Sequence, residues 1–493
     1  MTGRFLNLAM VFVLCCTAIA GPSLASQEAE GLQPVALDVA GAYGISRIDP
    51  NLTGQGVNIG VVCRSSTYID SNPQNDYRPD ISHNSLEDVK IRFHDDEGAL
   101  KAGISSHSTA IASILTGLDP NAFFEPIGDF SYQGACPDAG LDIYEFRHFL
   151  VKYVFSGIWP QADLLTISLG WSIENWWTRG IDKMAENFGI LVIASIGNGT
   201  NACDLPLYPA AGSNILAVGV ADSSGSLSQF SDPDANHSTT GPTLDGRCKP
   251  DIVAPGNCLV AVAGDEDAYK PSGDYSSFAV PAVAGVASLL IQKAKSDPNL
   301  QIAVFPFIGN CIMKSILMTS AEKLPGWHKG ASQSDDDYEY PLDFRQGAGM
   351  VDGLTAYNVL TAGMQRDGDV KATGWDTNVI EPNHIAEKVY HLKTDMTEKT
   401  HISATLVWNR SYENEYPFKP LLQHRADLKL ELWAIDAAGN SQLIDYSDSL
   451  VNNVEHIYFA LEPNTEYQLV VLHSSNSDLS SCFTFYAVSW QIR

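Results

Sequence analysis

The chain has 493 residues, which is long enough for two or three domains with full hydrophobic cores. Its composition, with 45% apolar and 18% charged residues, is typical of packed globular proteins rather than of disordered chains. The formal net charge of −28 argues against nucleic acids and anionic membrane surfaces as partners. We therefore expect a folded, soluble protein with an acidic, solvated surface.

The N-terminus has the pattern of an export signal. Arg4 precedes the apolar run LNLAMVFVLCCTAIA, and small residues suited to a signal peptidase follow at 18–20 and 23–25. This run is short for a bilayer span, and no later stretch reaches the roughly 18 to 20 apolar residues that a span requires. The sequence predicts a signal peptide over 1–25, no membrane span, and a secreted or periplasmic protein.

The first long region alternates strand-like and helix-like patterns. Short, nearly continuous apolar segments predict strands of a parallel sheet that is buried on both faces, at 56–62, 140–146, 163–170, 189–197 and 214–220. Helical patterns lie between them, for example at 108–117 and 176–189. This alternation predicts an α/β layered domain over 26–370 with a mostly parallel sheet.

Beyond residue 370 the hydrophobic pattern changes to a period of two. The alternating segments are 401–408, 427–433, 466–472 and 482–492. In the first two, the side chains expected on the buried face are Ile402, Ala404, Leu406, Trp408, Leu428, Leu430 and Leu432. Turn residues separate the segments, so the pattern predicts a C-terminal antiparallel β-sandwich over 371–493.

Two polar residues of the first region stand where catalytic groups are often found. Ser277 lies at the entrance to an apolar helix whose Ala and Gly residues allow close packing on a sheet, although a helix N-cap is the alternative role for this serine. We expect Pro281 to fall in the first turn of that helix, where proline is tolerated. Asn198 follows a strand and a glycine. Its side-chain amide either donates a hydrogen bond to an oxyanion or stabilises a turn.

The order of the segments resembles that of the subtilisin-like serine peptidases. Over residues 40–360, nine segments follow one another as the landmarks of that family do: GQGVNIGVV, SSHSTAIASILTG, GACPDAGLDIYEFR, LLTISLGW, ILVIASIGN, YPAAGSNILAVGVAD, KPDIVAPGNC, YSSFAVPAVAGVASLLI and QGAGMVDGLTAYNVL. The C-terminal region resembles the β-sandwich appended to some larger bacterial subtilisins. The resemblance implies the layered α/β fold of that family and a peptidase-type site.

The resemblance assigns roles to several residues. Ser277 falls on the nucleophile of the family, and Asn198 falls on the oxyanion-hole asparagine. The segment that lines the substrate groove of the family corresponds here to Ser168, Leu169, Gly170 and Trp171. Trp171 stands where the family usually has a glycine, so we expect it to crowd the primary specificity pocket.

The same comparison finds two members of the catalytic triad replaced. Ala110 stands at the position of the catalytic base, and Cys63 at that of the orienting aspartate. A serine hydroxyl is a poor nucleophile unless a neighbouring base takes its proton, and the base needs a partner that holds its tautomer. The sequence therefore predicts a catalytically impaired pseudopeptidase that still takes an extended peptide or protein in its groove.

Two other readings remain open at this point. The first is an active serine endopeptidase with a rearranged triad, for which His107, one helical turn before Ala110, is the nearest imidazole. The second is a peptide-binding or protein-binding module, in which either the groove or the β-sandwich is the functional part. Labelling of Ser277 by an active-site-directed phosphonate would favour the first reading.

The cysteines and acidic residues suggest few further sites. Some members of the family bridge nearly the same two points as Cys203 and Cys248, so the resemblance implies a disulfide there, with Cys63 as a free thiol. No clustered Cys/His spacing is visible, so neither a metal site nor a cofactor is expected from spacing. The acidic segment 334–340 is either a solvated loop or a calcium site.

Overall fold

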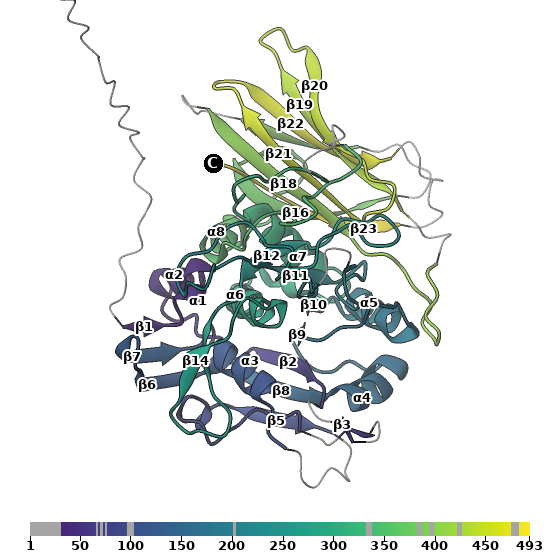
Figure 1. The fold of residues 1–493 in the computed structure, drawn as a ribbon. Helices are drawn as coiled ribbons and strands as arrows, with labels where there is room; N and C mark the ends of the chain where they lie inside the picture. Colours follow the sequence, from purple (N-terminus) through teal and green to yellow (C-terminus); the bar gives the residue numbers. More distant parts are fainter. Residues whose placement is uncertain are drawn as a thin grey trace, which may run out of the picture.

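The computed structural model describes most of the chain after the predicted signal peptide. The described ranges are 31–65, 68–69, 72–73, 76–95, 103–200, 204–331, 338–381, 387–393, 399–421, 426–474 and 483–493. The predicted signal peptide over 1–25 and Cys203 therefore lie outside the described residues. In Figure 1 the α/β part, in purple to teal, lies beneath the C-terminal sheets, in green to yellow.

A parallel sheet forms the centre of the first part of the chain. Within the described residues it has seven strands in the order β12-β11-β10-β9-β2-β8-β5, and every neighbouring pair is parallel. The strands are β2 (Asn58–Cys63), β5 (Ile91–His94), β8 (Gly140–Glu145), β9 (Leu164–Ile167), β10 (Leu191–Ser195), β11 (Leu216–Ala221) and β12 (Ile252–Pro255). All five segments expected to be strands belong to this sheet. The predicted α/β layered fold with a mostly parallel sheet is confirmed.

Helices pack on the sheet, and short strands lie at its margins. The helices are α1 (Val35–Val39), α2 (Ala42–Ile48), α3 (Ser106–Thr116), α4 (Phe146–Phe149), α5 (Trp176–Phe188), α6 (Ser276–Ser296), α7 (Gly309–Ser320) and α8 (Gly353–Ala362), with 3₁₀ turns at Asn84–Leu86 and Gln301–Val304 and a π-helical segment at Leu150–Phe155. The short strands are β1 (Leu32–Gln33), β3 (Tyr68–Ile69), β4 (Asn72–Pro73), β6 (Leu118–Phe124), β7 (Gly128–Gln133), β13 (Leu259–Ala261) and β14 (Tyr269–Pro271). The helices expected at 108–117 and 176–189 correspond to α3 and α5, and the apolar helix expected after Ser277 corresponds to α6.

Helix α6 packs on the sheet through its small residues. It contacts strands β9 to β12 and helix α3, and most of its side chains are buried. A Cβ added at Gly285 would lie 2.2 Å from Ala135 Cβ, so this close approach requires a glycine. Pro281 lies in the second turn of α6, which corrects the expected first-turn position. Proline is accommodated there because its neighbours satisfy the freed backbone carbonyl, as described for the site below.

The C-terminal part is a sandwich of two β-sheets. Over the described ranges, one sheet has the order β15-β17-β22-β19-β20 and the other β16-β23-β18-β21. The strands are β15 (Gly368–Val370), β16 (Thr373–Ile380), β17 (Lys388–Lys393), β18 (Thr400–Trp408), β19 (Leu428–Ile435), β20 (Ser441–Ser447), β21 (Val454–Leu461), β22 (Glu466–His473) and β23 (Thr484–Ile492). All pairs are antiparallel except β15 with β17, which is parallel.

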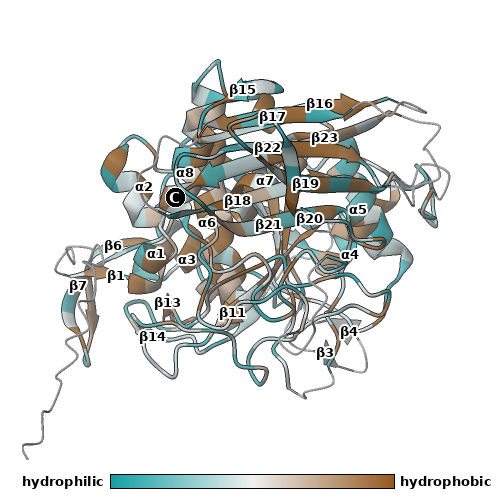
Figure 2. Ribbon diagram, turned by 90° about the horizontal axis from the view of Figure 1, so that it is seen from above, coloured by the Kyte–Doolittle hydropathy of each residue, from teal (hydrophilic) through white to brown (hydrophobic). Residues whose placement is uncertain are grey.

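The core of the sandwich follows the alternation in the sequence. All seven side chains expected to face inward, on β18 and β19, belong to one buried apolar cluster. Figure 2 shows hydrophobic and hydrophilic bands alternating along the strands of this region. Since successive side chains of a strand point to opposite faces, the period of two in the sequence specifies which face is buried.

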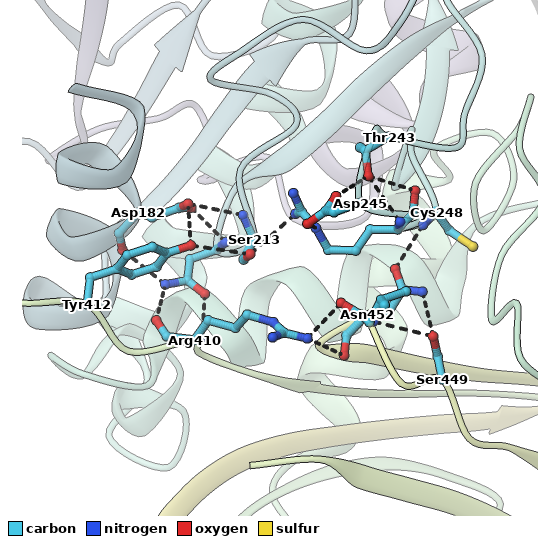
Figure 3. A network of polar contacts seen from close by, with 12 residues as sticks. Asp182, Ser213, Thr243, Asp245, Cys248, Arg410, Tyr412, Ser449 and Asn452 are labelled. Carbon is cyan, nitrogen blue, oxygen red and sulfur yellow. Dashed lines mark hydrogen bonds and ion pairs between the residues drawn. The ribbon is translucent and has the colours of Figure 1, made fainter. Parts of the chain in front are cut away.

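Polar contacts join the sandwich to the α/β part, and Figure 3 shows the network. The Tyr412 hydroxyl donates to Asp182 Oδ2 at 3.0 Å, and Cys248 N donates to Asn452 Oδ1 at 2.9 Å. All four side chains are buried. Helix α7 packs against β18 and β23 across the same boundary. The two parts therefore share a buried and hydrogen-bonded interface.

One helix among the described residues is long and apolar enough to cross a membrane. This helix is α6, and 78% of its most apolar window is buried inside the protein. Burial of this kind is the usual state of a core helix that packs against a sheet.

Candidate active site

A pocket opens where the C-terminal ends of β2, β9 and β10 meet the start of α6. The carboxyl ends of parallel strands lie at one edge of a sheet, which is where ligands of α/β proteins commonly bind. The volume of the pocket is about 380 Å³, within the range of small-ligand sites. Its lining residues are Val62, Cys63, Arg64, Ser65, His107, Ser168, Leu169, Gly170, Ser195, Gly197, Asn198, Leu207, Ser276 and Ser277. Most of the site residues expected from the sequence thus lie in one place.

Ser277 and Ser168 hold the two walls of this pocket together. The Ser277 Oγ donates to the Ser168 carbonyl at 3.3 Å, and the Ser168 Oγ donates to the Ser277 carbonyl at 2.8 Å. In a regular helix the Ser277 carbonyl would accept from the backbone N–H of residue 281. Pro281 has no N–H, and the Ser168 hydroxyl supplies the missing donor. The proline therefore fits its position in α6 because the groove segment provides the hydrogen bond.

Asn198 is fixed through its side-chain oxygen. Asn198 Oδ1 accepts hydrogen bonds from Ser276 N at 3.0 Å and from Ser276 Oγ at 2.8 Å. In the described part of the chain, no acceptor is bonded to Asn198 Nδ2. The amide is thus anchored beside Ser277 with its N–H groups available, which is the arrangement that an oxyanion-hole donor requires.

Cys63 and Ala110 lie in one buried apolar cluster beside the pocket. Both are 4% exposed. Burial raises the pKa of the Cys63 thiol to about 11, against the lowering effect of the Ser108 hydroxyl. The thiol is therefore neutral at physiological pH, and the Ala110 methyl has no atom that can accept a proton. At physiological pH neither side chain carries an imidazole or a carboxylate group.

His107 lines the same pocket as Ser277. Burial and the nearby Arg64 guanidinium lower the pKa of His107 to about 4. Its ring packs on that of Phe278, with the centroids 5.7 Å apart. No hydrogen bond joins His107 to Ser277 within the described residues. The imidazole is neutral at pH 7, but its low basicity makes it a weak general base.

Trp171 lies in an aromatic cluster and is absent from the residues that line the pocket. Its ring stacks on Phe146 with centroids 4.7 Å apart and meets Trp177 edge-on at 5.1 Å. The Arg64 guanidinium lies over the Trp171 ring, with its central carbon 5.8 Å from the ring centroid. The structure gives no sign of the expected crowding by Trp171.

Leu207 lines the pocket and lies close to Gly170 and Gly197. A Cβ added at Gly170 would lie 2.9 Å from Leu207 Cβ, and one added at Gly197 would lie 3.1 Å from Leu207 Cγ. The leucine side chain therefore packs between the two glycine-containing walls of the pocket. The sequence analysis missed this residue. The signal that could have indicated it is the pair of glycines, because glycine is required where another chain segment approaches closely.

The described cysteines are buried free thiols: Cys63, Cys136, Cys248, Cys258 and Cys311. Burial raises the pKa of Cys248 to about 12. The structure does not show the disulfide expected between Cys203 and Cys248, and Cys203 lies outside the described residues. The pairing stays a prediction. Most of the acidic segment 334–340 also lies outside them, so the possible calcium site is untested.

Comparisons with known proteins indicate the family of this chain. The model of the Subtilase family matches residues 54–349. Serine protease AprX of Bacillus subtilis (strain 168) is 25% identical over 297 residues, which cover 56% of this chain and 65% of AprX. Thermitase of Thermoactinomyces vulgaris is 32% identical over 155 residues, covering 31% of this chain and 50% of thermitase.

Among solved structures, that of sphericase is similar over 63% of this chain and 97% of its own, with 19% identity and a TM-score of 0.39. The chain spans between half and two thirds of the length of the two curated relatives named above. The family model, in contrast, extends from the residues before β2 to those after α7, and so includes every wall of the pocket. Because that match covers more than half of the chain, this protein belongs to the subtilase family.

Proposed function

We propose that this chain is an exported subtilase homologue with impaired peptidase activity. In this proposal Ser277 and Asn198 keep the nucleophile and oxyanion positions, whereas Ala110 and Cys63 replace the base and its orienting carboxylate. The observation that carries the proposal is the chemistry beside Ser277. In the proposal a methyl group and a neutral thiol, both buried, take the two positions at which the family has its base and the carboxylate that orients it.

The expected loss of activity is large. Removal of the serine or the histidine from a triad costs about 10⁶-fold in turnover, and the oxyanion hole with substrate binding retains only about 10³ to 10⁴ over water. The Ser277 hydroxyl also donates to the Ser168 carbonyl, so no base holds it in a reactive orientation. Hydrolysis at a useful rate is not expected from such a site.

We further propose that the pocket binds an extended peptide or a protein segment. The Ser168 hydroxyl of the segment 168–170 donates a hydrogen bond to the Ser277 carbonyl at the start of α6. The cavity of about 380 Å³ lies within the size range of ligand sites. Extended peptides bind most readily by adding a strand to an existing chain edge, with pockets that select their side chains. Since Leu207 fills the space between Gly170 and Gly197, the adjoining subsite suits small residues such as glycine or alanine.

A rearranged triad is the second candidate, and His107 is the observation that favours it. Its imidazole lines the same cavity as Ser277 and is neutral at pH 7. A weak base of this kind would support slow hydrolysis with a pH optimum well below that of an ordinary histidine-dependent enzyme.

One experiment separates the two candidates. The mature protein is incubated with a fluorophosphonate probe and, separately, with casein, alongside the Ser277→Ala and His107→Gln variants. Impairment predicts no casein cleavage and no probe labelling above the Ser277→Ala background. Cleavage that both variants abolish would establish the rearranged triad instead. Ser296→Ala, at the exposed end of α6, is the matched serine control.

Export and domain organisation belong to the same proposal. Cleavage after residue 25 is tested by N-terminal sequencing of the protein recovered outside the cytoplasm. The sandwich sheets support the proposed C-terminal unit over 371–493. Because β15 pairs with β17, we propose that this unit also includes Gly368–Val370. The buried contacts of Figure 3 favour a single cooperative unfolding transition for both units.

A further inference from the structure

A second constellation lies outside the pocket, at Asp222, His237 and Asp274. One nitrogen or oxygen from each side chain lies within 4.8 Å of the other two. Asp222 follows β11, whereas Asp274 stands in the loop before α6, and none of the three residues lines the pocket of Ser277. Sequence spacing gave no hint of this group, because its members come from three separate loops.

The separation of two of these atoms fits a metal site. His237 Nδ1 and Asp222 Oδ1 are 3.4 Å apart. In a tetrahedral site with metal–ligand bonds of about 2.0 to 2.1 Å, neighbouring ligand atoms are about 3.3 to 3.4 Å apart. The pair is thus spaced as two ligands of one cation would be.

Two polar atoms of the group make no hydrogen bond, although they are shielded from water. His237 Nδ1 and Asp274 Oδ1 are both buried and make no hydrogen bond within the part of the chain that the structure describes. Buried polar atoms are nearly always bonded, so the unbonded Asp274 Oδ1 and a His237 Nδ1 that meets Asp222 Oδ1 only at 3.4 Å require an explanation. A single cation between them would satisfy both.

Neighbouring groups orient the carboxylates. Asp274 Oδ2 accepts from Ser223 Oγ at 2.7 Å and from Ser223 N at 3.3 Å. Asp222 Oδ2 accepts from Ser224 Oγ at 2.9 Å. Each carboxylate is therefore held through its second oxygen, which leaves the first free for a ligand, as in many metal sites.

We propose that Asp222, His237 and Asp274 bind one divalent cation of the zinc class. The imidazole nitrogen argues against calcium and magnesium, which prefer oxygen ligands, whereas zinc accepts one nitrogen and two carboxylates with a water in the fourth position. The site would fasten the loop after β11 to the loop before α6, three residues ahead of Ser277. This inference does not depend on the proposed function, since it concerns binding alone.

The test is a titration of the EDTA-treated, full-length mature protein with Zn²⁺ by isothermal calorimetry, repeated with Ca²⁺. We expect one Zn²⁺ per chain and no comparable binding of Ca²⁺. Asp222→Asn and His237→Gln should each weaken Zn²⁺ binding by about 100-fold or more. The matched controls are Asp265→Asn and His401→Gln, which remove the same groups elsewhere on the surface and should bind as the unaltered protein does.

Thermal unfolding distinguishes loss of a ligand from loss of the fold. Zn²⁺ should raise the melting temperature of the unaltered protein but not that of the variants, and the metal-free melting temperatures should agree. The His237→Gln variant is informative in any event, because 45% of the His237 side chain is exposed and its replacement disturbs little packing. Binding of less than about a tenth of an equivalent, or unchanged affinity in His237→Gln, would overturn the proposal.

Discussion

Restoration of the missing triad groups is the most direct test of the proposed impairment. The change is the pair Cys63→Asp and Ala110→His in one chain. Cys63 ends β2, Ala110 lies on α3, and both belong to the same buried cluster beside the Ser277 pocket. An imidazole at 110 would then stand between a carboxylate at 63 and the serine hydroxyl, as catalysis requires.

The expected gain in rate follows from what the site already holds. Asn198 is anchored by Ser276 in the position that the proposal gives to the oxyanion donor, and a positioned general base adds about 10² to 10⁴-fold. We expect a gain within this range and below that of an evolved triad, since no surrounding group holds the new imidazole in register. Each single change should gain little, because triad members act as a unit.

The expected cost in stability follows from burial. A lone carboxylate at position 63, where the thiol is only 4% exposed, should destabilise the fold by about 3 to 5 kcal/mol. An imidazole at position 110 adds about 1 to 3 kcal/mol of overpacking. The double variant should be more stable than the sum of the single changes predicts, because the new imidazole partners the new carboxylate.

Turnover of a chromogenic peptide with a small residue at the cleavage site is the activity assay, and urea unfolding measures stability. The same double variant with Ser277→Ala is the control and should lose all of the gain. A gain that survives this control would refute the assignment of Ser277 as nucleophile. Full activity from Ala110→His alone would refute the role given to position 63.

The remaining predictions concern pH, packing and thiols. The pKa of His107 is about 4 in the folded protein and 6.5 in the unfolded chain, so the unfolded chain binds the proton more tightly. The free energy of unfolding should therefore fall by up to about 3 kcal/mol as the pH drops from 6.5 to 4. His107→Gln should reduce this slope in urea unfolding, and an unchanged slope would contradict the assignment. Tyr412→Phe removes a hydrogen-bond donor to buried Asp182 and should lower the free energy of unfolding by about 1.5 to 3 kcal/mol. Tyr416→Phe, at an exposed ring, should leave it almost unchanged, and equal losses in the two variants would argue against the interface contact. Cys63, whose pKa is raised, should resist alkylation by iodoacetamide until the protein unfolds. Peptide maps made without reduction should show Cys63 unpaired. A map in which Cys203 is joined to Cys248 would establish the predicted disulfide.

Local patterns in the sequence determined the elements and the order of the fold. The nearly continuous apolar segments became strands of the parallel sheet, and the alternating residues from Ile402 to Leu432 became the inner face of the sandwich. Periodicity predicts these features because it specifies which side chains of a strand share a face. The positions of Ser277 and Asn198 followed from order along the chain, since the ends of parallel strands meet at one edge.

Only the tertiary structure decided what surrounds those residues. The packing of Trp171 on Phe146, the wedging of Leu207 between two glycines and the hydrogen bond that Ser168 gives in place of the N–H absent from Pro281 all join segments far apart in the chain. The meeting of Asp222, His237 and Asp274 is of the same kind. Periodicity specifies which face of a helix or strand is buried. The contacts between loops depend instead on how the strand ends are spaced and on which side chains fill the gaps between them.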